Sequence, residues 1–148
     1  MLCRSAATKD QQQKMQIREI HYTATLDIRR RVLWPDKAKE FCIVDGDATA
    51  THYGLFLQDT LIGVASLYEN SGAIRLRKFA VDTRFQGNGY GTALLSHAID
   101  SARARDALCF WCDARETAIQ FYQQFGLQVD GNRFYKSDIP YFTMSLTF

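Results

Sequence analysis

The stretch RFQGNGYGT, residues 84–92, places three glycines at alternate positions between a strand pattern and a helix pattern. Because Gly87, Gly89 and Gly91 carry no side chain, the amides of residues 86–92 can approach a ligand closely and can adopt positive φ. The helix pattern that follows begins with unpaired N–H groups, which together with the helix dipole favour an anion. The spacing therefore predicts a cradle for a pyrophosphate. A plain turn is the alternative, although it would need only one glycine.

Two well-known phosphate motifs do not fit this stretch. A dinucleotide fingerprint needs a glycine three residues after Gly89, where this chain has Thr92, and it opens the first of several βαβ units. Here three strand patterns precede the glycines. A P-loop ends in Gly-Lys-Ser/Thr, but no lysine occurs between Lys78 and Lys136. Neither motif explains the glycines.

The cysteines offer a second kind of chemistry; they are Cys3, Cys42, Cys109 and Cys112. The last two have the Cys-x-x-Cys spacing of zinc and redox sites. They fall in ALCFWCDA, which is typical of a buried strand, and residues three apart on a strand point to opposite faces. We therefore expect core cysteines, no metal site, and free thiols suited to a reducing cytoplasm.

The composition argues against two classes of partner. The 148 residues carry 18 basic and 16 acidic side chains, for a net charge of +2, which gives no electrostatic case for nucleic acid. The basic run Arg29-Arg30-Arg31 is interpreted as a solvated helix face. No apolar run approaches the ~20 residues of a membrane helix. We expect residues 1–14 to be a disordered leader and residues 15–148 to form one domain.

Alternating and helical apolar patterns place these motifs on a succession of elements. The expected strands are 15–20, 52–58, 61–69, 73–81, 108–112, 127–136 and 141–148, and the expected helices are 23–34, about four turns from residue 90, and 115–125. Thr23 is the expected cap of the first helix, Pro35 ends it, and Gly126 ends the last. The order β-α-β-β-β-α-β-α-β-β predicts one mixed sheet with helices packed on it.

At its glycine stretch the chain resembles the GNAT superfamily of N-acetyltransferases. The family's main motif, Gln/Arg-x-x-Gly-x-Gly/Ala after a strand that ends in Val-Asp, is matched by Val81, Asp82, Gln86, Gly89 and Gly91. A second feature, a helix with Ala-x-x-x-Tyr before a Gly-apolar pair, is matched by Ala118, Tyr122, Gly126 and Leu127. The resemblance covers residues 15–148. It implies an α/β (α+β) fold with a mostly antiparallel central sheet of about six to seven strands, flanked by helices.

The resemblance implies acetyl-CoA as cosubstrate and no metal. The pantetheine arm would lie along the backbone of Phe79, Ala80 and Val81, in the gap where the central strands splay apart. The pyrophosphate would rest on the amides of Gln86, Gly87, Asn88, Gly89, Tyr90, Gly91 and Thr92. Arg115 stands where relatives commonly have an asparagine that contacts the cofactor.

The resemblance also implies the chemistry. The backbone N–H near Val81 would polarise the thioester carbonyl, a free amine would attack directly in a ternary complex, and Tyr122 would protonate the departing thiolate. Tyr122 lies on the apolar face of its helix, so a core tyrosine is the alternative. A route through an acetylated Cys112 is disfavoured, because nothing next to it in sequence would lower its pKa.

The general base is where the chain departs from the family. Many relatives carry a glutamate at the places of Arg75 and Phe110, which leaves Asp113, His52 or a water in that role. The missing carboxylates make a non-catalytic acyl-CoA sensor or regulatory module the alternative function.

The acceptor is expected to be a small-molecule or protein amine, while the use of other acyl groups and a homodimer stay open. The aromatic residues that could line its pocket, with hydrophobic core as the alternative, are Trp34, Phe41, Tyr68 and Tyr141.

Overall fold

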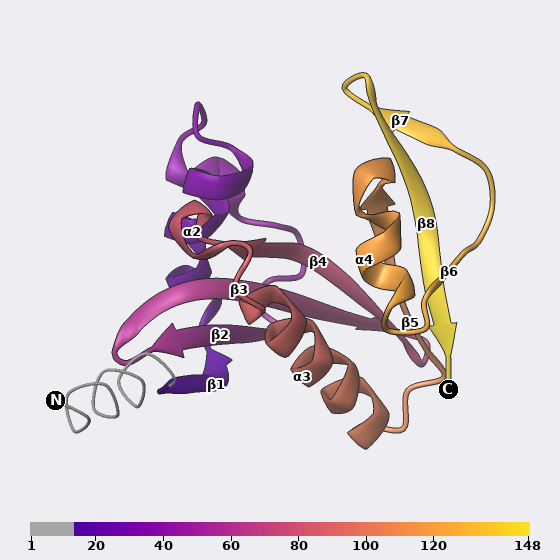
Figure 1. Cartoon of the computed structure of the whole chain (residues 1–148), viewed down its shortest axis with the longest axis horizontal. Helices are drawn as coiled ribbons and strands as arrows, with labels where there is room; N and C mark the ends of the chain where they lie inside the picture. The colour runs from indigo at the N-terminus through magenta and orange to yellow at the C-terminus, as the bar shows by residue number, and fades with distance from the viewer. Residues whose placement is uncertain (1–13) are drawn as a thin grey trace, which may run out of the picture.

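A computed structural model describes residues 14–148, which form one mixed sheet with helical segments packed against it (Figure 1). Of the expected leader, residues 1–13 lie outside the described part of the chain. The strands are β1 (Met15–Ile20), β2 (Thr51–Leu57), β3 (Thr60–Asn70), β4 (Ala73–Val81), β5 (Cys109–Arg115), β6 (Gln128–Val129), β7 (Phe134–Lys136) and β8 (Ile139–Thr147).

The sheet is mostly antiparallel, as the sequence predicted. Its order is β1-β2-β3-β4-β5-β8-β6, with β7 also paired to β8, and among these neighbours only β4 and β5 run parallel. It has eight strands rather than six or seven. The difference arises at residues 127–136, where a turn at Gly131 with φ of 101° divides the single expected strand into β6 and β7.

The helical segments are η1 (Tyr22–Thr25), α2 (Leu26–Ile28), η2 (Arg29–Leu33), η3 (Lys39–Cys42), η4 (Thr83–Phe85), α3 (Tyr90–Ala104), η5 (Glu116–Ala118) and α4 (Ile119–Gln123). The first three form the helix expected at 23–34. Its cap is His21 rather than Thr23, because the His21 ring nitrogen Nδ1 accepts from the backbone N–H of Thr23 at 3.3 Å. The helix expected from Arg115 begins one residue later, because Arg115 still pairs with β8.

Helices cover both faces of the sheet. Neighbouring residues on a strand point to opposite faces, and Val64 and Ala65 of β3 belong to different apolar clusters. Ala65 lies in the larger cluster with Leu94 and Leu95 of α3 and with Tyr122 of α4. Val64 packs with Ile28 of α2 and with Ala80 of β4. The first helix therefore lies on the face opposite α3, against the last residues of β4.

A buried ion pair fixes this first helix to the sheet and corrects the interpretation of the arginine run at its first residue, Arg29. Arg29 is fully buried rather than solvated, and its guanidinium donates to both carboxylate oxygens of Asp47, at 2.8 and 3.1 Å. It also donates to the Ser66 hydroxyl of β3 at 2.9 Å and to the Cys42 carbonyl at 2.9 Å. The pair therefore joins the first helix, the 43–50 connection and the sheet.

Other polar groups complete this network. The Tyr68 hydroxyl donates to the carboxylate of Asp47, and the Val44 N–H donates to the same group at 2.8 Å. Burial by itself raises the pKa of Asp47, but the guanidinium, the hydroxyl and the amide outweigh it and lower the pKa to about 2. His52 bonds to the Ser66 hydroxyl at 2.7 Å and to the Asp47 carbonyl at 2.8 Å, and burial lowers its pKa.

We expect Asp47→Asn to lower the free energy of unfolding by about 3 kcal/mol, because it leaves the buried Arg29 charge without a carboxylate. Urea unfolding at pH 7 measures the change. Asp45→Asn is the matched control, since Asp45 is exposed two residues away, and we expect a change within ~0.5 kcal/mol. Equal stability of the two variants would contradict a structural role for the pair.

The same pair predicts an acid dependence. The pKa of Asp47 is about 2 in the folded protein and about 3.9 in an unfolded chain. Its contribution to stability is therefore complete above pH ~4 and is lost as the pH falls through the folded pKa. The stability gap between the wild type and Asp47→Asn should narrow by about 2 kcal/mol between pH 6 and pH 2 in urea unfolding. A gap that stays constant over this range would contradict the assignment.

Candidate active site

The site begins where β4 and β5 part. These parallel strands pair only at Ala73–Arg75 with Cys109–Trp111, although each continues for several residues beyond (Figure 1). On its other side β4 carries a bulge, because Val64 opposes Ala80 whereas Ser66 opposes Arg77. Between these pairs β4 has two residues, Lys78 and Phe79, where β3 has one. Lys78 is in the left-handed conformation, with φ of 54°. A bulge bends its strand and increases its twist, so the second half of β4 turns away from β5.

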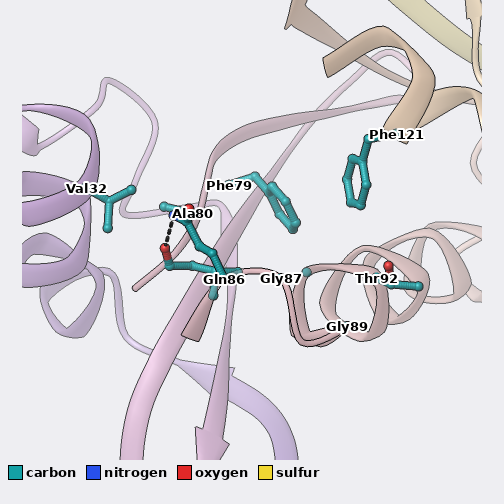
Figure 2. Close-up of a pocket in the computed structure, with 10 residues that line it drawn as sticks. Val32, Phe79, Ala80, Gln86, Gly87, Gly89, Thr92 and Phe121 are labelled. Atoms are coloured by element: carbon teal, nitrogen blue, oxygen red, sulfur yellow. Dashed lines mark hydrogen bonds between the residues drawn. The ribbon is translucent and has the colours of Figure 1, made fainter. Parts of the chain in front are cut away.

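A cavity of about 450 Å³ lies at the bent end of β4, against the start of α3 (Figure 2). Gly87 and Gly89 line it with φ of 79° and 85°, a conformation that side chains other than glycine rarely adopt. A Cβ at either position would meet no protein atom within 4 Å, so the space around these glycines is open. Gly89 is also the cap residue of α3, and no side chain caps its first amides. These amides are therefore available to an anion.

The backbone of Val81 faces the parted side of β4. The N–H of the next residue, Asp82, donates to the Ile62 carbonyl at 2.7 Å, on the β3 side. Because backbone groups in an antiparallel pair alternate in direction, the N–H and C=O of Val81 point away from β3. The Val81 carbonyl accepts from the side-chain amide of Gln86 at 2.8 Å (Figure 2). This bond ties the glycine loop to the end of β4.

Asp82 fixes the loop from the other side. It is almost fully buried and accepts from Arg31 of the first helix at 2.7 Å and from Arg84 at 3.1 Å. Its carboxylate also accepts from the backbone N–H of Arg84 at 3.0 Å. The Arg84 and Arg31 guanidiniums hold the pKa of Asp82 well below its usual range. The loop, β4 and the first helix are therefore joined at one carboxylate.

A second cavity, of about 560 Å³, adjoins the first and shares Phe79 and Phe121 with it. Figure 2 shows the two rings facing each other above the glycine loop, and their centroids are 6.0 Å apart. Tyr122 of α4 lines the second cavity and is nine-tenths buried. Burial and the neighbouring Cys112 raise the pKa of Tyr122, so its hydroxyl keeps its proton at neutral pH.

Cys112 lines the second cavity but is a poor nucleophile. Burial, with a further contribution from Asp113, raises the pKa of its thiol to about 12. The reactive thiolate is therefore scarce at neutral pH. Cys42, Cys109 and Cys112 are all free; the expectation for Cys3 lies outside the described residues. In residues 14–148 no cluster of three His, Cys, Asp or Glu side chains could hold a metal ion.

The structure brings most of the sequence-predicted site residues together. Those that line the first cavity are Phe79, Ala80, Val81, Gln86, Gly87, Gly89, Gly91 and Thr92. Arg115 and Tyr122 line the second cavity. Asn88 and Tyr90 line neither: the Asn88 amide donates to the Phe85 and Gln86 carbonyls, both at 3.2 Å, and Tyr90 packs on Phe85.

The candidate bases are placed differently. His52 belongs to the buried Asp47 network and lines neither cavity. Asp113 lines the second cavity, but Arg75, Lys136 and Thr143 bond to its carboxylate.

Two of the four aromatic residues expected to line an acceptor pocket lie at the second cavity. Trp34 and Tyr141 line the second cavity, whereas Tyr68 belongs to the buried network and Phe41 is exposed. Phe121, which separates the two cavities, was not singled out as a site residue. Its place with Ala118, Tyr122 and Phe125 on the apolar face of the expected helix was the available signal.

Comparison with known proteins agrees with this geometry. The family model "Acetyltransferase (GNAT) domain" matches residues 33–148. An uncharacterized N-acetyltransferase of Bacillus subtilis strain 168, YitI, is 29% identical over 135 residues, which cover 85% of this chain and 89% of that protein. The spermine/spermidine N(1)-acetyltransferase of the same organism is 30% identical over 101 residues, or 57% of this chain and 66% of that protein.

The fold is shared with a solved structure. A GNAT family acetyltransferase from Elizabethkingia anophelis, determined with acetyl-CoA bound, superposes with a TM-score of 0.72 at 16% identity. The match covers 92% of this chain and 99% of that one. In residues 14–148 no helix is both long enough and apolar enough to cross a membrane.

The family resemblance read from the two motifs is confirmed by the matching family model and by these relatives. The chain belongs to the GNAT family of acetyltransferases, and the protein is an acyltransferase.

Proposed function

We propose that this protein transfers the acetyl group of acetyl-CoA to a primary amine by direct attack in a ternary complex. One observation carries the proposal: two cavities meet at Phe79 and Phe121, one against a glycine cradle and the other against a buried tyrosine. The first suits a donor with a pyrophosphate, and the second leaves room for an acceptor. Two substrates can therefore meet at the junction.

The residues of the first cavity fit coenzyme A. The amides at the start of α3 and the open positions at Gly87 and Gly89 suit a pyrophosphate. The free edge of β4 at Phe79, Ala80 and Val81 suits the amide groups of a pantetheine arm, which can pair with it like an added strand. Acetyl-CoA supplies an activated thioester, and the relative from Elizabethkingia anophelis binds that compound.

A backbone amide and a tyrosine hydroxyl would supply the catalytic groups for acetyl transfer. The N–H of Val81, which points to the parted side of β4, would donate to the thioester carbonyl oxygen and to the negative charge that develops there. Tyr122, protonated at neutral pH, would give its proton to the departing sulfur. Asp113 accepts from Arg75, Lys136 and Thr143, so water is the better candidate to receive the proton of the attacking amine.

A non-catalytic acyl-CoA sensor is the second candidate function. It is favoured by Arg75 and Phe110, which occupy the places where many relatives carry a glutamate. In either case we infer a reducing, cytoplasmic setting from the free thiols of Cys42, Cys109 and Cys112. Release of free thiol from acetyl-CoA, followed over a panel of amines alongside calorimetric CoA affinity, separates the two functions. CoA binding without any amine-dependent release would leave only the sensor.

We expect Gly89→Ala to weaken CoA binding about tenfold, because its methyl group would fill the cradle. Gly131→Ala is the matched control: Gly131 also has a positive φ and open space around it, but it lines neither cavity. Isothermal titration with CoA measures both. An equal loss in the two variants would point to backbone strain alone and contradict a phosphate role for the glycine loop.

We expect Tyr122→Phe to lower kcat about 10²-fold or more while CoA affinity stays within about twofold, because the variant loses only the proton donor. Tyr53→Phe is the control, since its hydroxyl is bonded to Ser101 at 2.7 Å and it lines neither cavity. Steady-state kinetics with the best amine of the panel checks both. A kcat unchanged in Tyr122→Phe would leave Tyr122 as a core tyrosine.

A further inference from the structure

The lining of the second cavity carries an excess of positive charge. Its basic residues are Arg75, Arg77, Lys78, Arg115 and Lys136. Against these stands one acidic residue, Asp113. They come from β4, from the end of β5 and from β7, so three separate elements direct cationic side chains to the same space. The chain as a whole has a net charge of only +2, and the cavity therefore concentrates charge that the composition does not reveal.

The one carboxylate neutralises part of this charge. Asp113 accepts from Arg75 at 2.9 Å and from Lys136 at 3.3 Å through the same oxygen. Its other oxygen accepts from the Thr143 hydroxyl at 2.8 Å. A single carboxylate thus serves two cations and is saturated with donors. It has no capacity left for the other three basic residues.

These three have no carboxylate partner within the described residues. No Asp or Glu oxygen of residues 14–148 lies within 4.0 Å of the cationic nitrogens of Arg77, Lys78 or Arg115. Lys78 lies over the Trp34 ring, 4.0 Å from its centroid, and Arg77 lies 5.6 Å from the centroid of Tyr68. Both are partly buried. Partly buried cations that lack a counter-ion are costly, so a ligand that neutralises them binds with a corresponding gain.

Neighbouring cations act on one another here. Burial, with contributions from Arg77 and Lys136, lowers the pKa of Lys78 to about 8. Burial and Arg75 lower the pKa of Arg77. Both shifts have the direction expected of uncompensated positive charge. These pKa shifts agree with the excess of positive charge that the lining residues of the second cavity and their lack of carboxylate partners indicate.

The pyrophosphate of the donor does not account for these cations. In the proposed complex it rests against Gly87 and Gly89, which line the first cavity but not the second. The rings of Phe79 and Phe121 stand between the cradle and the basic cluster. The cluster instead shares its cavity with Tyr122, on the acceptor side of the junction.

We propose that the acceptor is an amine that carries an anionic oxygen group, a carboxylate or a phosphate, on the same small molecule, and that Arg77 and Lys78 bind that group. This inference rests on the proposed function, since it names the class of acceptor for the same site. Trp34 and Tyr141 add aromatic walls to the cavity. A polyamine, which the related spermine/spermidine N(1)-acetyltransferase takes by its name, would meet like charge here.

The charge of the cavity also bears on the reaction. The amine nitrogen forms a bond to the acetyl carbon, the C–S bond breaks, and the nitrogen loses a proton to water. The sulfur gains a proton from Tyr122, which water then reprotonates. A cationic cavity disfavours the ammonium form of the acceptor and so favours the neutral amine that attacks. The anionic group places the amine in this field without adding a carboxylate base.

Acceptors in matched pairs test the proposal. Phenylalanine is compared with phenylalanine amide, and phosphoethanolamine with ethanolamine; spermidine represents a polyamine. The neutral member of each pair has the less basic amine, because it lacks the nearby negative charge, so reactivity alone favours it. We expect kcat/KM to be at least about tenfold higher for the anionic member of one pair, and that pair identifies the anion. Preference for the neutral members or for spermidine would overturn the proposal.

Variants of the basic residues test whether they cause the preference for an anionic acceptor. Arg77→Gln and Lys78→Gln should each lower kcat/KM for the anionic acceptor about tenfold more than for the neutral one. Arg77→Lys should restore part of the loss. Arg133→Gln is the control, because Arg133 pairs with Glu116 and lines neither cavity. An equal loss for both members of a pair would overturn the assignment.

A binding measurement separates failure of this inference from failure of the proposed function. The CoA-loaded protein is titrated with N-acetylphenylalanine and with its amide, which requires no turnover. Tighter binding of the anionic product by about tenfold supports the acceptor class even if no acetyl transfer is detected. Acetyl transfer to neutral amines with equal binding of both products would sustain the proposed function and overturn this inference.

Discussion

The parting of β4 from β5 is the constraint on which the rest of the site depends. Two parallel strands that pair at Ala73–Arg75 and then separate leave backbone groups without a partner strand. Such groups must find other partners or remain open to a ligand. The bulge at Lys78 enforces the separation, because the additional residue bends β4 and cannot be removed without shifting the register against β3. The two cavities therefore lie on either side of one irregularity in the sheet.

Two buried carboxylates hold the elements around this gap. Asp47 binds Arg29, and the same guanidinium donates to Ser66 of β3, which attaches the first helix to the sheet. Asp82 binds Arg31 of the same helix and caps the turn that begins the glycine loop. Two arginines only two residues apart on one helix thus reach the sheet and the loop. A buried ion pair adds little net stability, because desolvation offsets the attraction, but it fixes the relative position of the two elements that carry its partners. Positional accuracy is what a site assembled from separate elements requires.

The features that the sequence predicted correctly are those set by neighbouring residues, and the features that it missed depend on contacts between distant ones. Alternation located β1, β4 and the other long strands, and the glycine spacing identified the cradle, because both are local patterns. The arginine run was misread as solvated, since the partner of Arg29 lies 18 residues away at Asp47. The division of residues 127–136 depended on the turn at Gly131 and on pairing with β8, which no local pattern encodes. The basic cluster was missed for the same reason: Arg77, Arg115 and Lys136 are far apart in sequence and meet only in the fold.

The absence of a glutamate at the positions of Arg75 and Phe110 is consistent with catalysis if the second cavity is cationic. A carboxylate base is needed when the acceptor arrives as an ammonium ion and must lose its proton in the site. Burial beside neighbouring cations lowers the pKa of Lys78 to about 8, and the same surroundings would lower the pKa of an amine bound there. A carboxylate there would cancel the field that favours the neutral form. If the acceptor is anionic, as proposed, Arg75 and the shielded Asp113 would be parts of one electrostatic arrangement, in which positive charge attracts the acceptor and favours its reactive amine.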